Sequence, residues 1–314
     1  MKETGEIGVV VVTHRPSGGM GARLQAMRCQ GAFFVVVDNG SSPAERSLLA
    51  FEAARLGGEW VANVENIGLA AALNQGVSRL RDRGCAWALL FDQDSEPPRS
   101  LGQRLARDVA DHPGNARIAA IGPNFRDAAT GRSHRFLRAD DRVRWLFSKT
   151  PMTDSVLPVT MVITSGSLVR IAAWEAVGRF DEGLFIDYVD TDFCLKARAE
   201  GWTILATPSA CLQHRLGNRE VRRFLVWKAA PTHHSPLRHY YIARNRVPLL
   251  RRHGRREVHW VLFEVCAAAL WVFRVVAFER AKLKKLRAML VGTWDGLCGH
   301  NGPCPLSRRR TFET

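Results

Sequence analysis

The sequence predicts an α/β fold with a doubly wound, mostly parallel β-sheet flanked by helices, and a helical C-terminal extension. Short apolar, β-branched runs alternate with amphipathic segments of helical length in the N-terminal part of the chain. The apolar runs cover residues 7–12, 33–37, 87–91 and 118–121, and the helix-like segments cover residues 20–29, 44–55, 69–83 and 101–111. Runs of this kind suit strands that are buried on both faces of a parallel sheet. Their alternation with helices predicts the doubly wound arrangement.

The pattern becomes less regular after the fourth apolar run. Residues 123–158 carry scattered charges without a clean period, so we expect a long loop region there. A helix is expected to begin near Asp190, a strand to cover residues 203–206, and helices to follow Pro236. We therefore expect a catalytic domain over residues 1–235 and a basic helical extension over residues 236–314.

The composition restricts the classes of protein and partner. Hydrophobic residues make up 46% of the 314 residues, which is enough for a sizeable core. The formal net charge of +15 and the pI near 10.3 indicate an anionic partner, although solvated helix faces are the ordinary alternative. No helix-turn-helix, zinc or RNA-binding signature accompanies the basic residues, so we expect no nucleic-acid partner. Gly-rich dinucleotide and P-loop motifs are also missing from the sequence.

The cysteines and the first residues predict the compartment. The seven cysteines are scattered and form no Cys-x-x-Cys pair, which is typical of a protein in a reducing compartment. No apolar signal segment precedes the first expected strand, so we expect a cytoplasmic protein.

Residues 258–278 form a long and mostly apolar segment. His259, Glu264 and Arg274 interrupt it, whereas a spanning helix needs about 20 nearly uncharged residues. Basic residues at both ends favour a helix lying in the interface of an anionic membrane, with the protein peripheral on the inner face of the cytoplasmic membrane. A helix packed on the catalytic domain is the equal alternative.

Polar residues follow three of the expected strands directly. They are Thr13 and His14, the turn Asp38-Asn39-Gly40-Ser41, and the triplet Asp92-Gln93-Asp94. Ligands of open α/β sheets bind beyond the carboxyl ends of the strands. We therefore expect these three sets to converge on one crevice.

Asp92 and Asp94 are candidate metal ligands. Two carboxylates spaced two residues apart at a strand end can both face Mg²⁺ or Mn²⁺, which would bridge a bound diphosphate and neutralise its charge. The same triplet occurs in ordinary turns. It also resembles the motif of haloacid-dehalogenase-type phosphatases, in which Asp92 would be the nucleophile. That motif follows the first strand of its domain, whereas Asp92 follows a later one.

Asp38 and Asn66 are candidate nucleotide-binding residues. A carboxylate at the position of Asp38 can accept the ring N–H of uracil or thymine, although an ordinary Asx turn is the alternative. Asn66 precedes the expected helix at Leu69, where it could cap the helix or approach a nucleotide.

The acidic cluster Asp187, Asp190 and Asp192 precedes the next expected helix. Carboxylates there can cap the helix and interact with its dipole, or one of them can serve as a general base. We expect Asp192 to cap the helix or to pair with Lys196, four residues on. His214 lies just beyond the expected strand at 203–206, where it is either a surface residue or a further metal ligand.

Several of these motifs together carry a resemblance to a known family. They are residues 37–41, 66–70, 91–95, 165–166, 185–192, 240–241 and 244–245. Over about residues 7–245 the chain resembles family-2 glycosyltransferases of the glycosyltransferase-A fold, particularly the bacterial rhamnosyltransferases. The resemblance implies inverting transfer of L-rhamnose from dTDP-L-rhamnose to a saccharide or lipid-linked saccharide, in the synthesis of cell-surface polysaccharide. It places residues 123–158 on the acceptor side and leaves the oligomeric state open.

The resemblance also implies roles for individual residues. Asp190 occupies the position of the catalytic base in the usual Glu-Asp pair, but Val189 replaces the Glu, so that Asp187 remains a second candidate. Asp38 is implied to recognise the nucleobase of the donor. Metal binding is implied for Asp92, Asp94 and His214, and contacts near the diphosphate are implied for Tyr240 and Arg244. Thr13 and Asn66 complete the expected nucleotide-sugar site. The competing functions are the phosphatase and a basic module that binds membrane or nucleic acid.

Overall fold

The computed structural model describes residues 5–127, 135–138, 149–151, 154–214, 222–224, 227–229 and 234–313. The strands are β1 (Ile7–Thr13), β2 (Phe33–Asn39), β3 (Glu59–Asn63), β4 (Trp87–Asp92), β5 (Ile118–Asp127), β6 (Arg135–Leu137), β7 (Lys149–Pro151), β8 (Leu157–Pro158), β9 (Leu168–Arg170), β10 (Thr203–His214), β11 (Arg222–Phe224) and β12 (Trp227–Ala229). The helices are α1 (Met20–Arg28), α2 (Pro43–Arg55), α3 (Leu69–Asp82), α4 (Leu101–Asp111), α5 (Ile171–Ala176), α6 (Val189–Ala199), α7 (Pro236–His253), α8 (Val258–Phe278), α9 (Lys282–Leu297) and α10 (Leu306–Glu313), with 3₁₀ turns η1 (Asn115–Arg117) and η2 (Glu182–Leu184).

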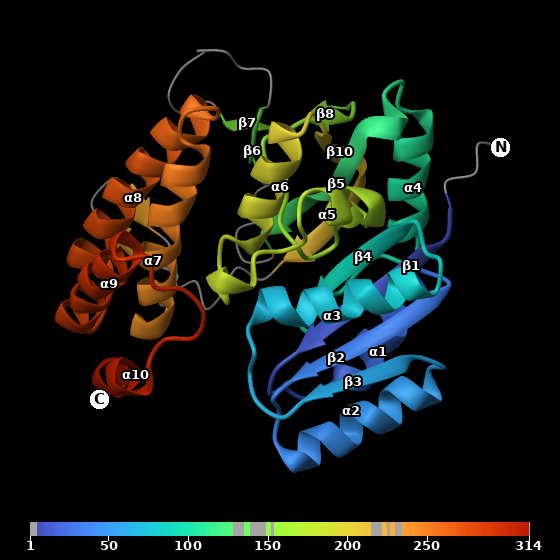
Figure 1. The fold of residues 1–314 in the computed structure, drawn as a ribbon, viewed down its shortest axis with the longest axis horizontal. Helices are drawn as coiled ribbons and strands as arrows, with labels where there is room; N and C mark the ends of the chain where they lie inside the picture. The colour runs from blue at the N-terminus through green and yellow to red at the C-terminus, as the bar shows by residue number, and fades with distance from the viewer. Residues whose placement is uncertain are drawn as a thin grey trace.

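One eight-stranded sheet forms the centre of the molecule, in the order β3-β2-β1-β4-β9-β5-β10-β8 (Figure 1). β1 pairs in parallel with both β2 and β4, and β3 extends this parallel half at the edge. β9 lies antiparallel between β4 and β5, and β8 lies antiparallel to β10. The prediction of a mostly parallel sheet flanked by helices is confirmed, and the parallel strands end at the same edge.

Helices cover both faces of this sheet and divide the core into two layers. Val10 and Val12 of β1 pack into the layer that contains α3, α5 and α6. Val9 and Val11 of the same strand pack into the opposite layer, with α1, α2 and α4. Successive strand residues point to opposite faces, so the unbroken apolar runs of the sequence reflect burial on both sides of the sheet.

Several elements differ from the sequence-based expectations. The region 123–158 is not wholly loop, because β5 continues to Asp127 and β6, β7 and β8 follow within it. The strand expected over residues 203–206 extends to His214, because β10 continues to pair with β5 after a register shift between Thr207 and Cys211. His214 therefore ends the strand rather than lying beyond it.

The C-terminal helices pack on one another through close backbone contact. Gly292 and Gly296 of α9 lie against backbone carbonyls of Tyr240 and Arg244 in α7, where any Cβ would clash. Figure 1 shows α7, α8 and α9 grouped at one end of the molecule, with α7 towards α6 and the sheet. This arrangement brings the first turns of α7 next to residues 185–188, the acidic segment that precedes α6.

Candidate active site

A cleft of about 670 Å³ opens at the carboxyl ends of the parallel strands. Its lining residues are Val12, Thr13, His14, Asn39, Asn66, Leu69, Asp92, Gln93, Asp94, residues 163–165, residues 185–190, His234 and Arg238. The residues that follow β1, β2 and β4 therefore converge, as the strand order requires. The acidic segment before α6 closes the cleft from the other side.

Asp92 is the carboxylate most affected by its neighbours. It ends β4, and burial raises its pKa from the ordinary range to about 7, with a further increase from the negative charges of Asp94 and Asp190. Arg238 acts in the opposite direction. Three carboxylates that repel one another around a cleft favour the binding of a cation.

The two carboxylates of the Asp-Gln-Asp triplet suit a cation that arrives with a phosphate ligand. Among the described residues, no group of three His, Cys, Asp or Glu side chains is placed to hold a metal ion by itself. Mg²⁺ is commonly bound through one or two carboxylates together with substrate phosphates and water, and Asp92 with Asp94 fits this requirement. The side chain of His214 lies outside the described residues, so its proposed part in the metal site stays a prediction.

Asp190 lies in the first turn of α6, at the edge of the cleft. Its Oδ2 accepts a hydrogen bond from the backbone N–H of Thr164 at 3.2 Å, and its Oδ1 accepts one from Thr191 N–H at 2.8 Å. Burial nevertheless raises its pKa, against the effect of these two bonds. The result is a fixed carboxylate with more proton affinity than an exposed aspartate.

Asp187 differs from Asp190 because a cation already holds it. Arg238 donates from Nη2 to Asp187 Oδ1 at 2.9 Å and from Nε to both carboxylate oxygens at 3.2 Å. The sequence analysis missed Arg238, although it anticipated helical structure after Pro236. The sequence offered one signal for Arg238, namely its position in the first turn of the helix that also carries the Tyr-Tyr and Arg-Asn motifs.

The acidic segment has a strained backbone. Phe185, Asp187 and Tyr188 have φ values of 64°, 63° and 66°, which residues other than glycine rarely adopt. The Asn245 side-chain amide donates to the carbonyls of Leu184, Ile186 and Asp187, at 2.9, 2.8 and 3.0 Å. Strain of this kind persists where the surroundings impose it, and it concentrates at functional sites.

Tyr240 and Arg244 do not line the cleft, which corrects the expectation that they contact the diphosphate. Both are buried, because they lie on the faces of α7 that α9 and the η2 turn cover. The Tyr240 hydroxyl donates to Asp295 at 2.7 Å, and Arg244 donates to the carbonyls of Gly183 and Leu184 at 3.1 and 2.9 Å. Arg244 therefore supports the turn before the acidic segment from behind, and Tyr240 connects α7 to α9.

Asp38 lies behind the cleft and is fully buried. Its carboxylate accepts hydrogen bonds from Arg46 Nε at 3.2 Å and from the backbone N–H of Ser41 at 3.3 Å. The next residue, Asn39, lines the cleft. The structure therefore places Asp38 next to the lining, in a turn that already gives it two partners.

Asn66 lines the cleft but does not cap α3, which corrects one of the two roles considered for it. Its Oδ1 accepts from the amide of Asn39 at 3.1 Å and from the backbone N–H of Gly68 at 2.9 Å. Gly68 itself precedes the helix with a φ of 93°. A Cβ at this glycine would lie 2.8 Å from the carbonyl oxygen of Phe185, so the turn and the acidic segment approach each other too closely for a side chain.

No family model matches the chain. It is 29% identical over 297 residues to the dTDP-rhamnosyl transferase RfbF of Shigella flexneri, a match that covers 93% of this chain and 96% of RfbF. Residues 1–349 of TarS from S. aureus superimpose with a TM-score of 0.58 at 13% identity, over 93% of this chain and 80% of that one. The mannosyltransferase PcManGT from Pyrobaculum calidifontis, in complex with GDP-Man and Mn²⁺, gives a TM-score of 0.54 at 17% identity, over 93% of this chain and 87% of that one.

The chain shares the glycosyltransferase-A fold with these solved transferases. These three similarities are to sugar transferases, and they favour that class over the phosphatase interpretation of Asp92 and over a purely binding function of the basic helices. Residues 185–190 line the cleft at the strand ends, opposite the residues that end β1, β2 and β4.

Proposed function

We propose that the enzyme transfers L-rhamnose from dTDP-L-rhamnose to a hydroxyl group of a saccharide or lipid-linked saccharide, with inversion at the anomeric carbon. The observation that carries this proposal is the meeting of Asp92, Asp94 and Asp190 in one cleft beyond the parallel strands. The choice of donor rests on the similarity to the RfbF enzyme along nearly the whole of both chains.

The transfer needs a single displacement. The acceptor oxygen forms a bond to the anomeric carbon while the bond from that carbon to the diphosphate oxygen breaks, and dTDP leaves with the electron pair. The acceptor proton passes to the carboxylate of Asp190, whose partners among the described residues are N–H and O–H donors and whose pKa is raised by burial. General-base assistance of this kind contributes about 10²–10⁴-fold to turnover.

The leaving diphosphate requires positive charge. Asp92 and Asp94 would hold Mg²⁺ or Mn²⁺ against the diphosphate, and the bound ion would neutralise charge that develops on the leaving group. Arg238 faces the same cleft and adds a fixed guanidinium, which Asp187 orients through two of its nitrogens. Residues 1–349 of TarS, which share this fold, have been crystallised with UDP and with UDP-GlcNAc, which is consistent with a nucleotide-sugar donor.

The proposal can be tested with a panel of nucleotide sugars. The purified enzyme is incubated with dTDP-L-rhamnose, UDP-glucose, UDP-GlcNAc or GDP-mannose, with Mg²⁺ or Mn²⁺, and release of the nucleoside diphosphate is measured. We expect dTDP-rhamnose to be consumed fastest, and an α-linked product from the β-linked donor by NMR. Preference for a UDP- or GDP-sugar would refute the donor, and a β-linked product would refute the single displacement. Asp82→Asn, at an exposed carboxylate on α3, serves as the control for Asp190→Asn.

A further inference from the structure

The outer side of α8 carries a continuous apolar stripe. Its exposed large side chains follow one another at intervals of one to five residues and are 40–61% exposed; they are Val258, Leu262, Val265, Leu270, Val272, Phe273 and Val276. Of the helices in the described residues, α8 is long and apolar enough to cross a membrane by length and composition, with a mean hydropathy of 2.1 over its most apolar window. Only 11% of that window is buried within the protein.

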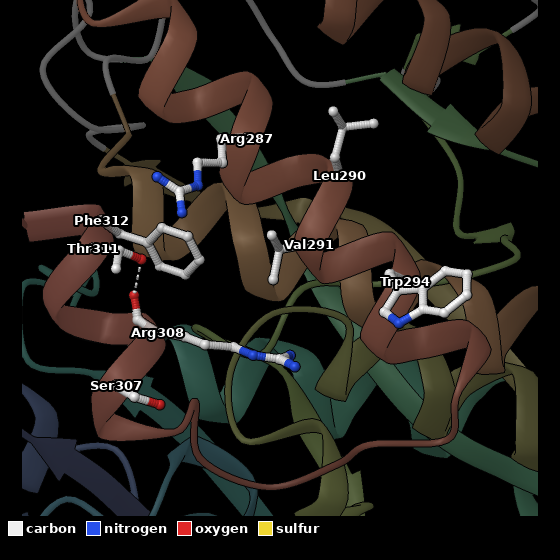
Figure 2. Close-up of a pocket in the computed structure, with 8 residues that line it drawn as sticks. All are labelled: Arg287, Leu290, Val291, Trp294, Ser307, Arg308, Thr311 and Phe312. Carbon is white, nitrogen blue, oxygen red and sulfur yellow. Dashed lines mark hydrogen bonds between the residues drawn. The ribbon is translucent and has the colours of Figure 1, made fainter.

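The stripe has a counterpart on the neighbouring helix α9. Leu283, Leu290, Trp294 and Leu297 follow one another at intervals of three to seven residues and are 48–83% exposed. A groove of about 520 Å³ between α9 and α10 is lined by Leu290 and Trp294 from α9 and by Phe312 from α10, residues that are labelled in Figure 2. α8 and α9 lie at the same end of the molecule (Figure 1), so both stripes contribute to the surface of that end.

The exposed charges in these two helices have only one sign. Every acidic residue between positions 258 and 298 is buried, namely Glu264, Glu279 and Asp295. The exposed charged residues are Arg274, Arg280, Lys282, Lys284 and Arg287, all of them basic. A surface that combines long apolar side chains with a rim of cations complements the acyl chains and anionic headgroups of a bilayer.

The inner side of α8 is tied to the catalytic domain. Glu264 accepts hydrogen bonds from the Tyr188 hydroxyl and from Arg246 Nε, the latter at 2.8 Å. Burial and the charge of Glu264 raise the pKa of Tyr188, so the hydroxyl keeps its proton and donates it in this bond. Since Tyr188 also lines the catalytic cleft, α8 is held one side chain away from that cleft. A helix that spanned the membrane would have to break these contacts, whereas a helix lying on the surface retains them.

We propose that the outer stripes of α8 and α9 form a docking surface for a bilayer that contains anionic lipids. A second copy of the chain fits the surface less well, because a symmetric contact would place the basic rims of both copies together. Docking through α8 presents the cleft to acceptors at the membrane surface. The proposal does not depend on the identity of the donor sugar.

The experiment measures flotation of the full chain with vesicles of phosphatidylcholine alone or with about a third of phosphatidylglycerol. We expect flotation with the anionic vesicles at low salt and less with the neutral ones. The triple variant Val265→Gln, Phe273→Gln, Leu290→Gln should lose at least about tenfold in partitioning. Its control is Leu48→Gln with Phe51→Gln on α2, whose side chains are 51% and 63% exposed at a distant site.

A second pair of variants tests the charged rim. Arg280→Gln with Lys282→Gln should weaken partitioning by roughly 25-fold, or about fivefold per charge, while Arg55→Gln with Arg107→Gln leaves it unchanged. Failure of the wild type to float at low salt would overturn the proposal, as would wild-type flotation of the triple variant. Conversion of a wild-type dimer to a monomer by the triple variant would assign the surface to a second copy instead. Donor hydrolysis by each variant reports separately on the catalytic cleft.

Discussion

Asp190 and Asp187 lie in the same segment but have different partners. Asp187 is neutralised by Arg238, whereas the hydrogen bonds that Asp190 accepts within the described part of the chain come from the backbone N–H groups of Thr164 and Thr191 and from the Thr191 hydroxyl. A proton taken up by Asp187 would disrupt its ion pair with Arg238, whereas no ion pair involves Asp190 among the described residues. The unpaired carboxylate is therefore the better candidate, and Arg238 with Asp187 is better suited to the diphosphate.

The first prediction separates these two roles. Asp190→Asn should lower kcat by at least about 10²-fold while leaving the affinity for dTDP and metal close to that of the wild type. Asp187→Asn should instead raise KM for the donor, because Arg238 loses the partner that orients it. Steady-state kinetics combined with calorimetric titration of dTDP distinguishes the two. Retained turnover in Asp190→Asn together with loss in Asp187→Asn would move the base to Asp187.

Protonation of Asp92 leads to the second prediction. With a pKa of about 7, roughly half of this carboxyl is protonated at neutral pH in the ligand-free enzyme. A cation must displace that proton, so binding of dTDP with Mg²⁺ should release about half a proton at pH 7 and almost none at pH 8.5. Affinity should fall as the pH decreases below 7. Titration calorimetry in buffers of different ionisation enthalpy measures the release, and its absence at pH 7 would contradict the raised pKa.

The third prediction concerns Asp38. It distinguishes recognition of the donor's nucleobase by Asp38 from the structural role of its ion pair with Arg46. Loss of a charged hydrogen bond costs about 1.5–3 kcal/mol, so Asp38→Ala should weaken dTDP binding roughly ten- to a hundred-fold. Arg46→Ala disturbs the same ion pair from the other side and is the control. Similar losses of dTDP affinity in both variants would show that Asp38 acts only by holding the turn.

Patterns in the sequence located the residues of the cleft more reliably than they located the faces of α7. Asp92 and Asp94 follow a buried strand, and the end of a parallel strand defines the place of the next residues in space. Tyr240 and Arg244 lie in a helix, where a shift of one or two positions turns a side chain to another face. Residue type alone could not show that Arg238 faces the cleft while Arg244 supports the chain behind it.

At the scale of elements, the strands that the sequence predicted differ in length and burial from the strands that it did not predict. β1, β2 and β4 are apolar because neighbours cover both of their faces. β3 is an edge strand with three of its five residues half-buried or charged, and β9 has only three residues, Leu168–Arg170. Neither has enough length or apolar character for a pattern to emerge, and both depend on pairing with strands that are distant in the sequence.

The contact between α7 and the acidic segment gives the fourth prediction. The Asn245 amide holds three carbonyls of a segment whose backbone is strained at Phe185, Asp187 and Tyr188. Asn245→Ala should therefore lower kcat more than it raises KM for the donor, because Asp190 follows this segment directly. It should also lower the free energy of unfolding by about 1–3 kcal/mol, the cost of leaving buried carbonyls without donors.

The control for Asn245 is Arg251→Ala, which removes an exposed side chain of the same helix that donates to the Leu297 carbonyl. Kinetics and thermal unfolding of both variants are compared. An Asn245→Ala enzyme that loses stability but keeps its kcat would show that the segment holds its catalytic geometry without α7.

At the scale of the whole molecule, the position of the cleft between the sheet and the C-terminal helices connects ligand binding to stability. The cleft residues come from β1, β4, the start of α3, the segment before α6 and the first turn of α7. A ligand that contacts all of these elements binds the folded chain and not the unfolded one, so it should raise the temperature of unfolding. The crowded carboxylates Asp92, Asp94 and Asp190 make that stabilisation depend on a cation, because the diphosphate alone adds negative charge to negative charge.

The fifth prediction follows from this dependence. In EDTA, transfer should be abolished and dTDP should leave the temperature of unfolding unchanged, whereas Mn²⁺ or Mg²⁺ should restore both effects. At a hundredfold excess of ligand over Kd the stabilisation is about 2.7 kcal/mol, which shifts the unfolding temperature by several degrees. Asp94→Asn should remove the metal-dependent part of that shift while keeping the fold, since Asp94 is exposed in the cleft. Full transfer activity in chelator, or an undiminished shift in Asp94→Asn, would mean that Arg238 and other fixed groups neutralise the diphosphate without a metal ion.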